Sequence, residues 1–171
     1  VNGMSASDVQ KILNLKHAWE FVLDNDVLRC PSDFSMLSHI AGLVNEGFFA
    51  DGGRVRGVPV AIGGTSYVPP LPQESVIRER LAEIINAEKP CIDTAIELAI
   101  SCMKWQVFLD GNKRAAIIYA NHYLISKGGG LLIVPEADVQ TFRKLLVGHY
   151  EGTCSNELAA FMKEKCWRPL E

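Results

Sequence analysis

The stretch Q-V-F-L-D-G-N-K-R (residues 106–114) carries the most information in this chain. Asp110-Gly111 is a turn dipeptide, and an apolar-rich helical run follows over residues 115–126. A glycine turn before a helix presents free backbone N–H groups and the positive end of the helix dipole to an anion. Lys113 and Arg114 add two positive charges where helix starts normally favour acidic residues. This local conflict predicts that a phosphate from outside the chain binds at the helix start.

The same stretch resembles the signature of the Fic/Doc (filamentation induced by cAMP, death-on-curing) family, which runs His-x-Phe-x-Asp/Glu-Gly-Asn-Gly/Lys-Arg. The matching residues are Phe108, Asp110, Gly111, Asn112, Lys113 and Arg114, with Lys113 as in the Doc-like branch. Gln106 stands where the family places its catalytic histidine. Residues 52–72 resemble the family's hairpin, or flap, and residues 95–105 resemble the helix that leads into the signature.

The resemblance implies a mainly α-helical Fic fold, a bundle of about six to seven helices with one small β-hairpin flap. Residues 35–165 are expected to form the Fic-like core, and residues 1–34 an N-terminal helical extension. A chain of 171 residues is large enough to bury its own core, so we predict a single domain over residues 1–171.

Composition argues against several classes of protein. The net charge of −3 and the lack of a basic block argue against a nucleic-acid partner. Apolar runs are too short for a membrane span, and the first ten residues lack the charged and apolar regions of a signal peptide. The five cysteines are scattered and include no C-x-x-C pair, which indicates neither a disulfide framework nor a zinc site. The predicted setting is therefore the reduced cytoplasm. The resemblance to the Fic/Doc family adds the expectation that the protein is bacterial.

Hydrophobic periodicity and cap signals predict the other elements of the chain. The expected helices span about 8–24 (capped by Ser5 or Ser7), 33–46, 74–86, 92–105, 112–127, 136–149 and 155–166. The helix over 92–105 is apolar almost all round, so it should be central. A short extended piece is expected at residues 131–134. A hairpin is predicted with arms at 54–62 and 65–68, which Pro69, Pro70 and Pro72 should end.

The resemblance also implies a role for each site residue. Fic-family enzymes transfer part of a nucleotide, most often AMP from ATP, to a hydroxyl side chain of a target protein. Gly111 would let the backbone approach a phosphate, while Asn112 and Arg114 would bind phosphate oxygens. Asp110 would hold Mg²⁺, and Phe108 would point into the core. The flap would align the target backbone by strand addition through Ile62, Gly63, Gly64, Thr65, Ser66 and Tyr67. An antitoxin or a second copy of this chain is the other partner considered.

Two positions leave the function open between two hypotheses. Gln106 has no titratable proton acceptor, and the loss of a general base typically costs about 10²–10⁴-fold in rate. Its side chain can instead orient a hydroxyl or bond a buried backbone group. Lys113, beside Arg114, goes with phosphoryl transfer in Doc-like relatives. The chain is then either a transferase with altered activity or a catalytically inactive Fic-fold module that binds a nucleotide or a protein partner.

No other residue is predicted to replace the base. His122 lies ten residues beyond Asn112 on the same helix, about 15 Å along its axis, and the other histidines (His17, His39 and His149) fall on separate helices. Built-in inhibition by a glutamate is not expected either. The closest match to the family's inhibitory motif is G-L-V-N-E-G (residues 42–47), which lacks its Ser or Thr, and Ile117 replaces the arginine that would pair with Glu46.

Overall fold

The computed structural model describes residues 3–170, so the two ends of the predicted domain (1–2 and 171) lie outside the described residues. Eight α-helices and one two-stranded antiparallel sheet form within this range. The helices are α1 (Ala6–Val22), α2 (Asn25–Leu28), α3 (Phe34–Val44), α4 (Glu74–Asn86), α5 (Cys91–Trp105), α6 (Asn112–Ser126), α7 (Val139–Tyr150) and α8 (Ser155–Phe161). A 3-10 turn (Glu136–Asp138) precedes α7, and a π-helical turn (Met162–Cys166) extends α8.

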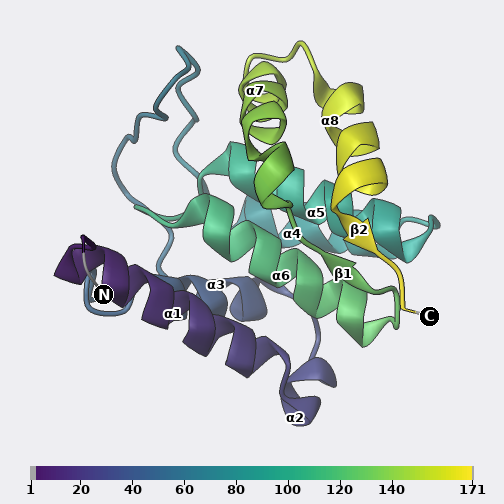
Figure 1. Cartoon of the computed structure of the whole chain (residues 1–171), viewed down its shortest axis with the longest axis horizontal. Helices are drawn as coiled ribbons and strands as arrows, with labels where there is room; N and C mark the ends of the chain where they lie inside the picture. The colour runs from purple at the N-terminus through teal and green to yellow at the C-terminus, as the bar shows by residue number, and fades with distance from the viewer. Residues whose placement is uncertain (1–2, 171) are drawn as a thin grey trace.

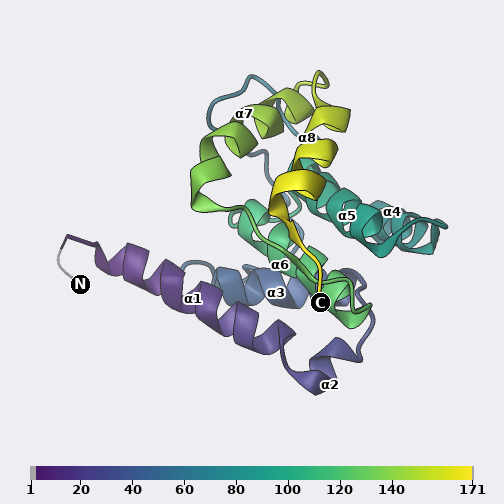
Figure 2. The ribbon, with the colours of Figure 1, turned by 45° about the vertical axis from the view of Figure 1, so that its right-hand side comes forward.

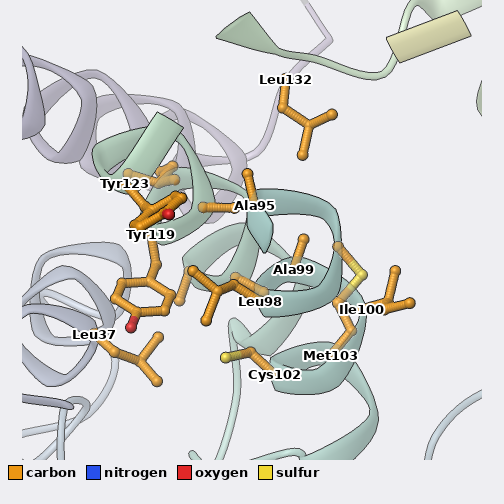
Figure 3. Close-up of a cluster of buried hydrophobic side chains, with 14 of the residues drawn as sticks. Leu37, Ala95, Leu98, Ala99, Ile100, Cys102, Met103, Tyr119, Tyr123 and Leu132 are labelled. Carbon is orange, nitrogen blue, oxygen red and sulfur yellow. The ribbon is translucent and has the colours of Figure 1, made fainter. Parts of the chain in front are cut away.

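Helix α6 runs through the middle of the molecule, between α1 and α3 on one side and α7 and α8 on the other (Figure 1). Its neighbour α5 is buried along most of its length, as its apolar sequence predicts. Leu98 of α5, Tyr119 of α6 and Leu37 of α3 belong to one buried cluster (Figure 3). The predicted central position of the helix over 92–105 is therefore confirmed.

The N-terminal helix α1 packs on α3, and its first half projects beyond the body of the molecule (Figure 2). Its cap is Ser5, whose side chain accepts a hydrogen bond from the N–H of Asp8 at 3.1 Å. Asn14 is fully buried and donates to the carbonyls of Val44 at 3.0 Å and Glu46 at 2.8 Å. These two bonds satisfy carbonyls just where α3 ends, so they tie α1 to the element that leads into the site.

Most helix bounds match the prediction, and α4 begins and ends at the predicted residues. Asp33 caps α3 by accepting a hydrogen bond from the N–H of Met36 at 3.0 Å. The short helix α2 was not predicted. It is a single turn held by Asp24, whose carboxylate accepts the N–H groups of Asp26 and Val27, and so short an element has no readable periodicity.

The predicted hairpin is wrong, because residues 54–68 contain no strand in the structure. The sheet instead joins β1 (Leu131–Leu132) to β2 (Trp167–Arg168), with Leu131 opposite Arg168. Within the loop, the Arg56 guanidinium donates to the carbonyls of Val58 at 2.8 Å and Pro70 at 2.7 Å. A buried arginine thus ties together the two ends of this loop in place of a ladder of backbone hydrogen bonds.

The loop over 54–73 leaves the body near α3 and returns to α4, and its tip reaches α7 (Figure 1). Thr65 donates a hydrogen bond to the Glu151 carboxylate at 2.7 Å. The rings of Tyr67 and Tyr150 stack with their centroids 6.1 Å apart and their planes 12° from parallel. The second arm of the loop is therefore docked on the C-terminal end of α7.

The state of the cysteines agrees with the prediction of no disulfide framework. All five cysteines are free, and Cys102 is 3% exposed, so it packs in the core as a small apolar residue. Burial raises the pKa of the Cys102 thiol far above its usual range, so this group stays protonated.

Among residues 3–170, no helix has both the length and the hydropathy that crossing a membrane requires.

Candidate functional site

The turn between α5 and α6 begins at Gln106, which has a left-handed φ of 47°. It is the one non-glycine residue with a positive φ in the described range. Such a backbone costs about 1–3 kcal/mol, so its surroundings must hold it in place. The buried Gln106 side chain donates to the carbonyl of Met103 at 2.7 Å, and the Gln106 carbonyl accepts a hydrogen bond from Nε of Arg56.

Asn112, the first residue of α6, closes this turn from the other side. Its Oδ1 accepts the backbone N–H of Phe108 at 2.9 Å, and its Nδ2 donates to the Phe108 carbonyl at 2.8 Å. The second amide hydrogen goes to Oε1 of Gln106 at 3.2 Å. Both amide hydrogens of Asn112 are thus engaged, so the phosphate contact predicted for Asn112 would come from its backbone N–H. Phe108 is 2% exposed and anchors the turn in the core, as predicted.

Gly111 supplies the backbone geometry at the helix start. Its φ is 72°, and a Cβ at this position would lie 2.8 Å from Cγ1 of Val44 and 2.9 Å from Oδ1 of Asn45. Asn45 is buried, and its amide nitrogen donates to the carbonyls of Asp110 and Gly52, both at 3.0 Å. The end of α3 therefore cradles the Asp110-Gly111 turn, and any side chain at residue 111 would collide with it.

The first turn of α6 offers donors to a ligand. No side chain of the described residues caps this helix, so the backbone N–H groups of residues 112–114 have no partner within the helix. Lys113 is exposed. Arg114 is half-buried, and its Nη2 lies 3.3 Å from Oδ2 of Asp110. Its Nη1 is buried and has no hydrogen-bond partner among the described residues. An anionic oxygen bound here would supply the missing acceptor.

The predicted metal residue, Asp110, keeps an accessible carboxylate. Its side chain is 56% exposed and shares one oxygen with Arg114. Among residues 3–170, no group of three or more His, Cys, Asp or Glu side chains forms a metal site. Mg²⁺ in phosphate-binding sites uses one or two carboxylates together with phosphate oxygens, so a lone exposed aspartate fits that mode of binding.

The loop predicted to dock a target is anchored at the signature. The N–H of Arg56 donates to the carbonyl of Val107 at 2.9 Å, one residue beyond Gln106. Along the second half of the loop, half-buried and exposed residues do not alternate strictly as they would in a strand. Ile62, Thr65 and Tyr67 are half-buried, and Gly63, Gly64 and Ser66 are exposed. These six residues remain predicted contacts for a target protein.

No histidine side chain makes a hydrogen bond to residues 106–114 within the described part of the chain. His122 and His149 are buried, and burial lowers the pKa of each imidazole, with Lys104 lowering that of His149 further. His17 and His39 are exposed. Glu46 lies just past α3, with its Oε2 4.0 Å from Nδ1 of His17, and no arginine pairs with it among the described residues. None of these groups supplies a base to the turn.

Sequence reasoning missed Asn45 and Arg56, which hold the site from outside the signature. Asn45 lies 65 residues before Asp110, and Arg56 lies 50 residues before Gln106. Each residue makes its contacts with buried carbonyls far away in sequence, and no local pattern in the chain marks such a contact.

The family comparison agrees with this geometry. The model of the Fic/DOC family matches residues 33–124, which run from the start of α3 to the last turns of α6. The chain belongs to the Fic/DOC family. Members of the Fic/DOC family are typically nucleotidyl- or phosphotransferases and generally use ATP and Mg²⁺. A search of curated proteins returned no match.

Solved structures of Fic proteins share the fold. Residues 134–508 of Fic-1 from C. elegans superimpose with a TM-score of 0.73 at 18% identity, over 95% of this chain. A Fic domain-containing signaling protein from Bacteroides thetaiotaomicron gives a TM-score of 0.73 at 14% identity, over 96% of this chain. This Fic chain spans 49% of the C. elegans chain and 70% of the Bacteroides chain. Likeness at such low identity shows the Fic fold alone.

Proposed function

We propose that this chain is a nucleotide-dependent transferase that modifies a hydroxyl side chain of a target protein. ATP would be the donor, and either a phosphoryl group or AMP would be transferred. Lys113 favours the phosphoryl group, because Doc-like relatives have lysine at this position. The loop over 54–73, anchored beside the signature, would present the target.

The unpartnered Nη1 of Arg114 carries this proposal. A buried donor without an acceptor costs about 1–3 kcal/mol, and a phosphate oxygen at the start of α6 would supply the acceptor. The same phosphate would meet the free backbone N–H groups of residues 112–114 and the positive end of the helix dipole. The exposed Lys113 adds charge without competing for a buried position.

Catalysis in this site would depend on positioning and charge stabilisation. The target hydroxyl must lose its proton, and Gln106 cannot accept a proton at neutral pH. Its side chain is also bonded to Met103 and Asn112, which holds the turn in shape. Mg²⁺ held by Asp110 would neutralise charge on the phosphates. We expect turnover about 10²–10⁴-fold below that of a relative with the histidine.

One observation favours a second candidate, a module that binds a nucleotide without turnover. Each polar atom of the Gln106 side chain already makes one hydrogen bond that holds the turn, so the side chain cannot swing towards a hydroxyl without breaking them. In that case the phosphate site would persist and the transfer step would be absent.

Labelled ATP separates the two candidates. The protein is incubated in a cell lysate with ATP labelled at either the α- or the γ-phosphate. Protein-bound γ-label alone indicates phosphoryl transfer, and protein-bound α-label indicates AMP transfer. No protein label from either ATP, in a sample that binds ATP, supports the module.

Two variants sharpen this experiment. Gln106→His restores the base and should raise the labelling of a target. Adding Lys113→Gly removes the lysine stem from the helix start and should shift the label from the γ- towards the α-phosphate. If neither variant labels any protein while both still bind ATP, the transferase proposal is wrong and the module remains.

A further inference from the structure

A second group of reactive side chains lies far from the signature, where the loop before α3 meets the C-terminal half of α6. Oγ of Ser32 lies 2.6 Å from Nδ1 of His122. His122 is fully buried, and its Nε2 lies 2.8 Å from the backbone carbonyl of Val27. The hydroxyl of Tyr119 donates to the Ser32 carbonyl at 2.6 Å, which fixes the backbone that carries the serine.

These contacts determine which ring nitrogen carries the proton. A carbonyl oxygen only accepts hydrogen bonds, so Nε2 of His122 must be protonated to bond Val27. Nδ1 of the neutral ring is then an acceptor, and Ser32 must donate its hydroxyl hydrogen to it. Burial lowers the pKa of His122, which keeps the ring in this neutral form near pH 7. The arrangement has the three parts of an activated nucleophile: a hydroxyl, a base and a group that orients the base.

Ser32 also lines a space that a ligand can enter. Ser32 is half-buried and lines a cleft of about 700 Å³ between α2, α4 and the end of α6. Leu28, Leu81 and Ile85 contribute apolar walls. Positive charges predominate among the lining residues, because Arg29, Arg78 and Lys127 are opposed by the single carboxylate of Asp33. Arg78 pairs with Glu74 at 2.7 Å and Arg29 with Asp26 at 3.4 Å, whereas Lys127 has no ion-pair partner among the described residues. The cleft therefore suits a ligand with an apolar part and an anionic group.

We propose that Ser32 is a nucleophile activated by His122, and that this cleft binds an acyl ester that carries an anionic group. Oγ of Ser32 bonds to the carbonyl carbon of the ester while its proton passes to Nδ1 of His122. The bond from that carbon to the alcohol oxygen then breaks, and the alcohol leaves with the proton from His122. Water hydrolyses the acyl-serine by the same proton transfers, which regenerates Ser32 and releases the acid. This activity is independent of the phosphate site on α6.

The chain contains a second serine–histidine pair that serves as an internal control. Oγ of Ser155 lies 2.9 Å from Nδ1 of His149, a separation similar to that at Ser32. Nε2 of His149, however, is buried and makes no hydrogen bond of good geometry among the described residues; its contact with the backbone of Ile100 is weaker, so its tautomer is held less firmly than that of His122. A serine that reacts only because a histidine is near would react at both places. A serine that needs an oriented base would react at Ser32 alone.

The test treats the full chain with a biotinylated fluorophosphonate, an electrophile that bonds to activated serines. Fragment masses then locate the adduct among Ser32, Ser35, Ser38 and Ser155. We expect the adduct at Ser32, its loss in Ser32→Ala, and unchanged labelling in Ser155→Ala. Hydrolysis of mono-p-nitrophenyl glutarate, an ester whose acyl chain ends in a carboxylate, should fall by about 10²-fold or more in Ser32→Ala, as the loss of a catalytic group predicts.

A further pair of variants tests the base without removing the site. In a Cys30→Ser background, Ser32→Cys should react with iodoacetamide several-fold faster than Ser155→Cys, because a neighbouring oriented base promotes the thiolate. The proposal is overturned if wild-type protein carries no adduct at Ser32. Equal labelling of Ser32 and Ser155, or a slower reaction at Cys in position 32 than in position 155, overturns it as well.

Discussion

Nδ2 of Asn112 donates a hydrogen bond to Oε1 of Gln106 across the turn that joins α5 to α6, at 3.2 Å. The residue at the position of the family's histidine is thus part of the frame that shapes the phosphate-binding turn. A substitution at either end of this bond is expected to change both the stability of the fold and the shape of the helix start.

Replacing Asn112 with alanine should destabilise the protein. The N–H and carbonyl of Phe108 would both lose their partner in a buried place, at a cost of about 1–3 kcal/mol for each unpaired group. Urea unfolding measures this as a lower midpoint. The control is Lys113→Ala at the next, exposed position, where we expect a change within about 0.5 kcal/mol. Equal midpoints for the two variants would show that the Asn112 bonds do not stabilise the turn.

Gly111→Ala should cost more than the same change at another left-handed glycine. Gly111 and Gly128 have φ of 72° and 67°, so both alanines carry a backbone cost of about 1–2 kcal/mol. A Cβ at residue 111 also meets Val44 and Asn45, whereas a Cβ at residue 128 meets nothing within 4 Å. The difference between the two unfolding free energies isolates the collision with α3. No difference would mean that α3 moves away at no cost.

Local signals in the sequence predict the helices well. The prolines up to Pro72 and the periodic apolar residues after them predict α4 at its observed bounds. Gly111 marks the start of α6. Each signal lies within a few residues of the element that it defines, so it can be recognised in a single sequence.

Contacts between distant segments are where the sequence prediction fails. The arms of loop 54–68 are rich in β-branched residues, which favour strands. The loop is nevertheless held by hydrogen bonds from the Arg56 guanidinium to the carbonyls of Val58 and Pro70. The actual sheet pairs Leu131 with Arg168, a partner that no turn signal connects to it. The left-handed backbone of Gln106 likewise depends on Arg56 and Asn112. In each case a tertiary contact outweighs the local propensity.

The docked tip of the loop gives a prediction about dynamics. Removing the bond from Thr65 to Glu151 by Glu151→Ala should speed amide hydrogen exchange over residues 61–68. Because the substituted residue Glu151 is exposed, global stability should change by no more than about 0.5 kcal/mol. The exposed Glu157→Ala on α8 is the control and should leave exchange in the loop unchanged. Unaltered exchange in Glu151→Ala would show that this bond does not hold the tip.

The two buried histidines predict how stability depends on pH. Their pKa values are lowered from 6.5 in the folded protein, so the unfolded chain takes up protons first as the pH falls. Stability should therefore be full above about pH 7 and decline from about pH 6.5 towards the lowered pKa values. Urea unfolding at pH 7.5, 6.5, 5.5 and 5 measures this decline. His149→Asn should remove part of it, and a wild-type stability that rises between pH 6.5 and 5 would contradict the assignment.

The most direct test of the central claim is whether a nucleotide binds at the start of α6 through Arg114. Titration calorimetry with ATP and Mg²⁺ is compared for wild type, Arg114→Ala and the exposed control Arg143→Ala on α7. A charge-assisted hydrogen bond contributes about 1.5–3 kcal/mol, so Arg114→Ala should weaken binding by about tenfold or more, and Arg143→Ala should leave it unchanged. A wild-type protein that binds no adenine or guanine nucleotide, or equal losses in the two variants, would contradict the account.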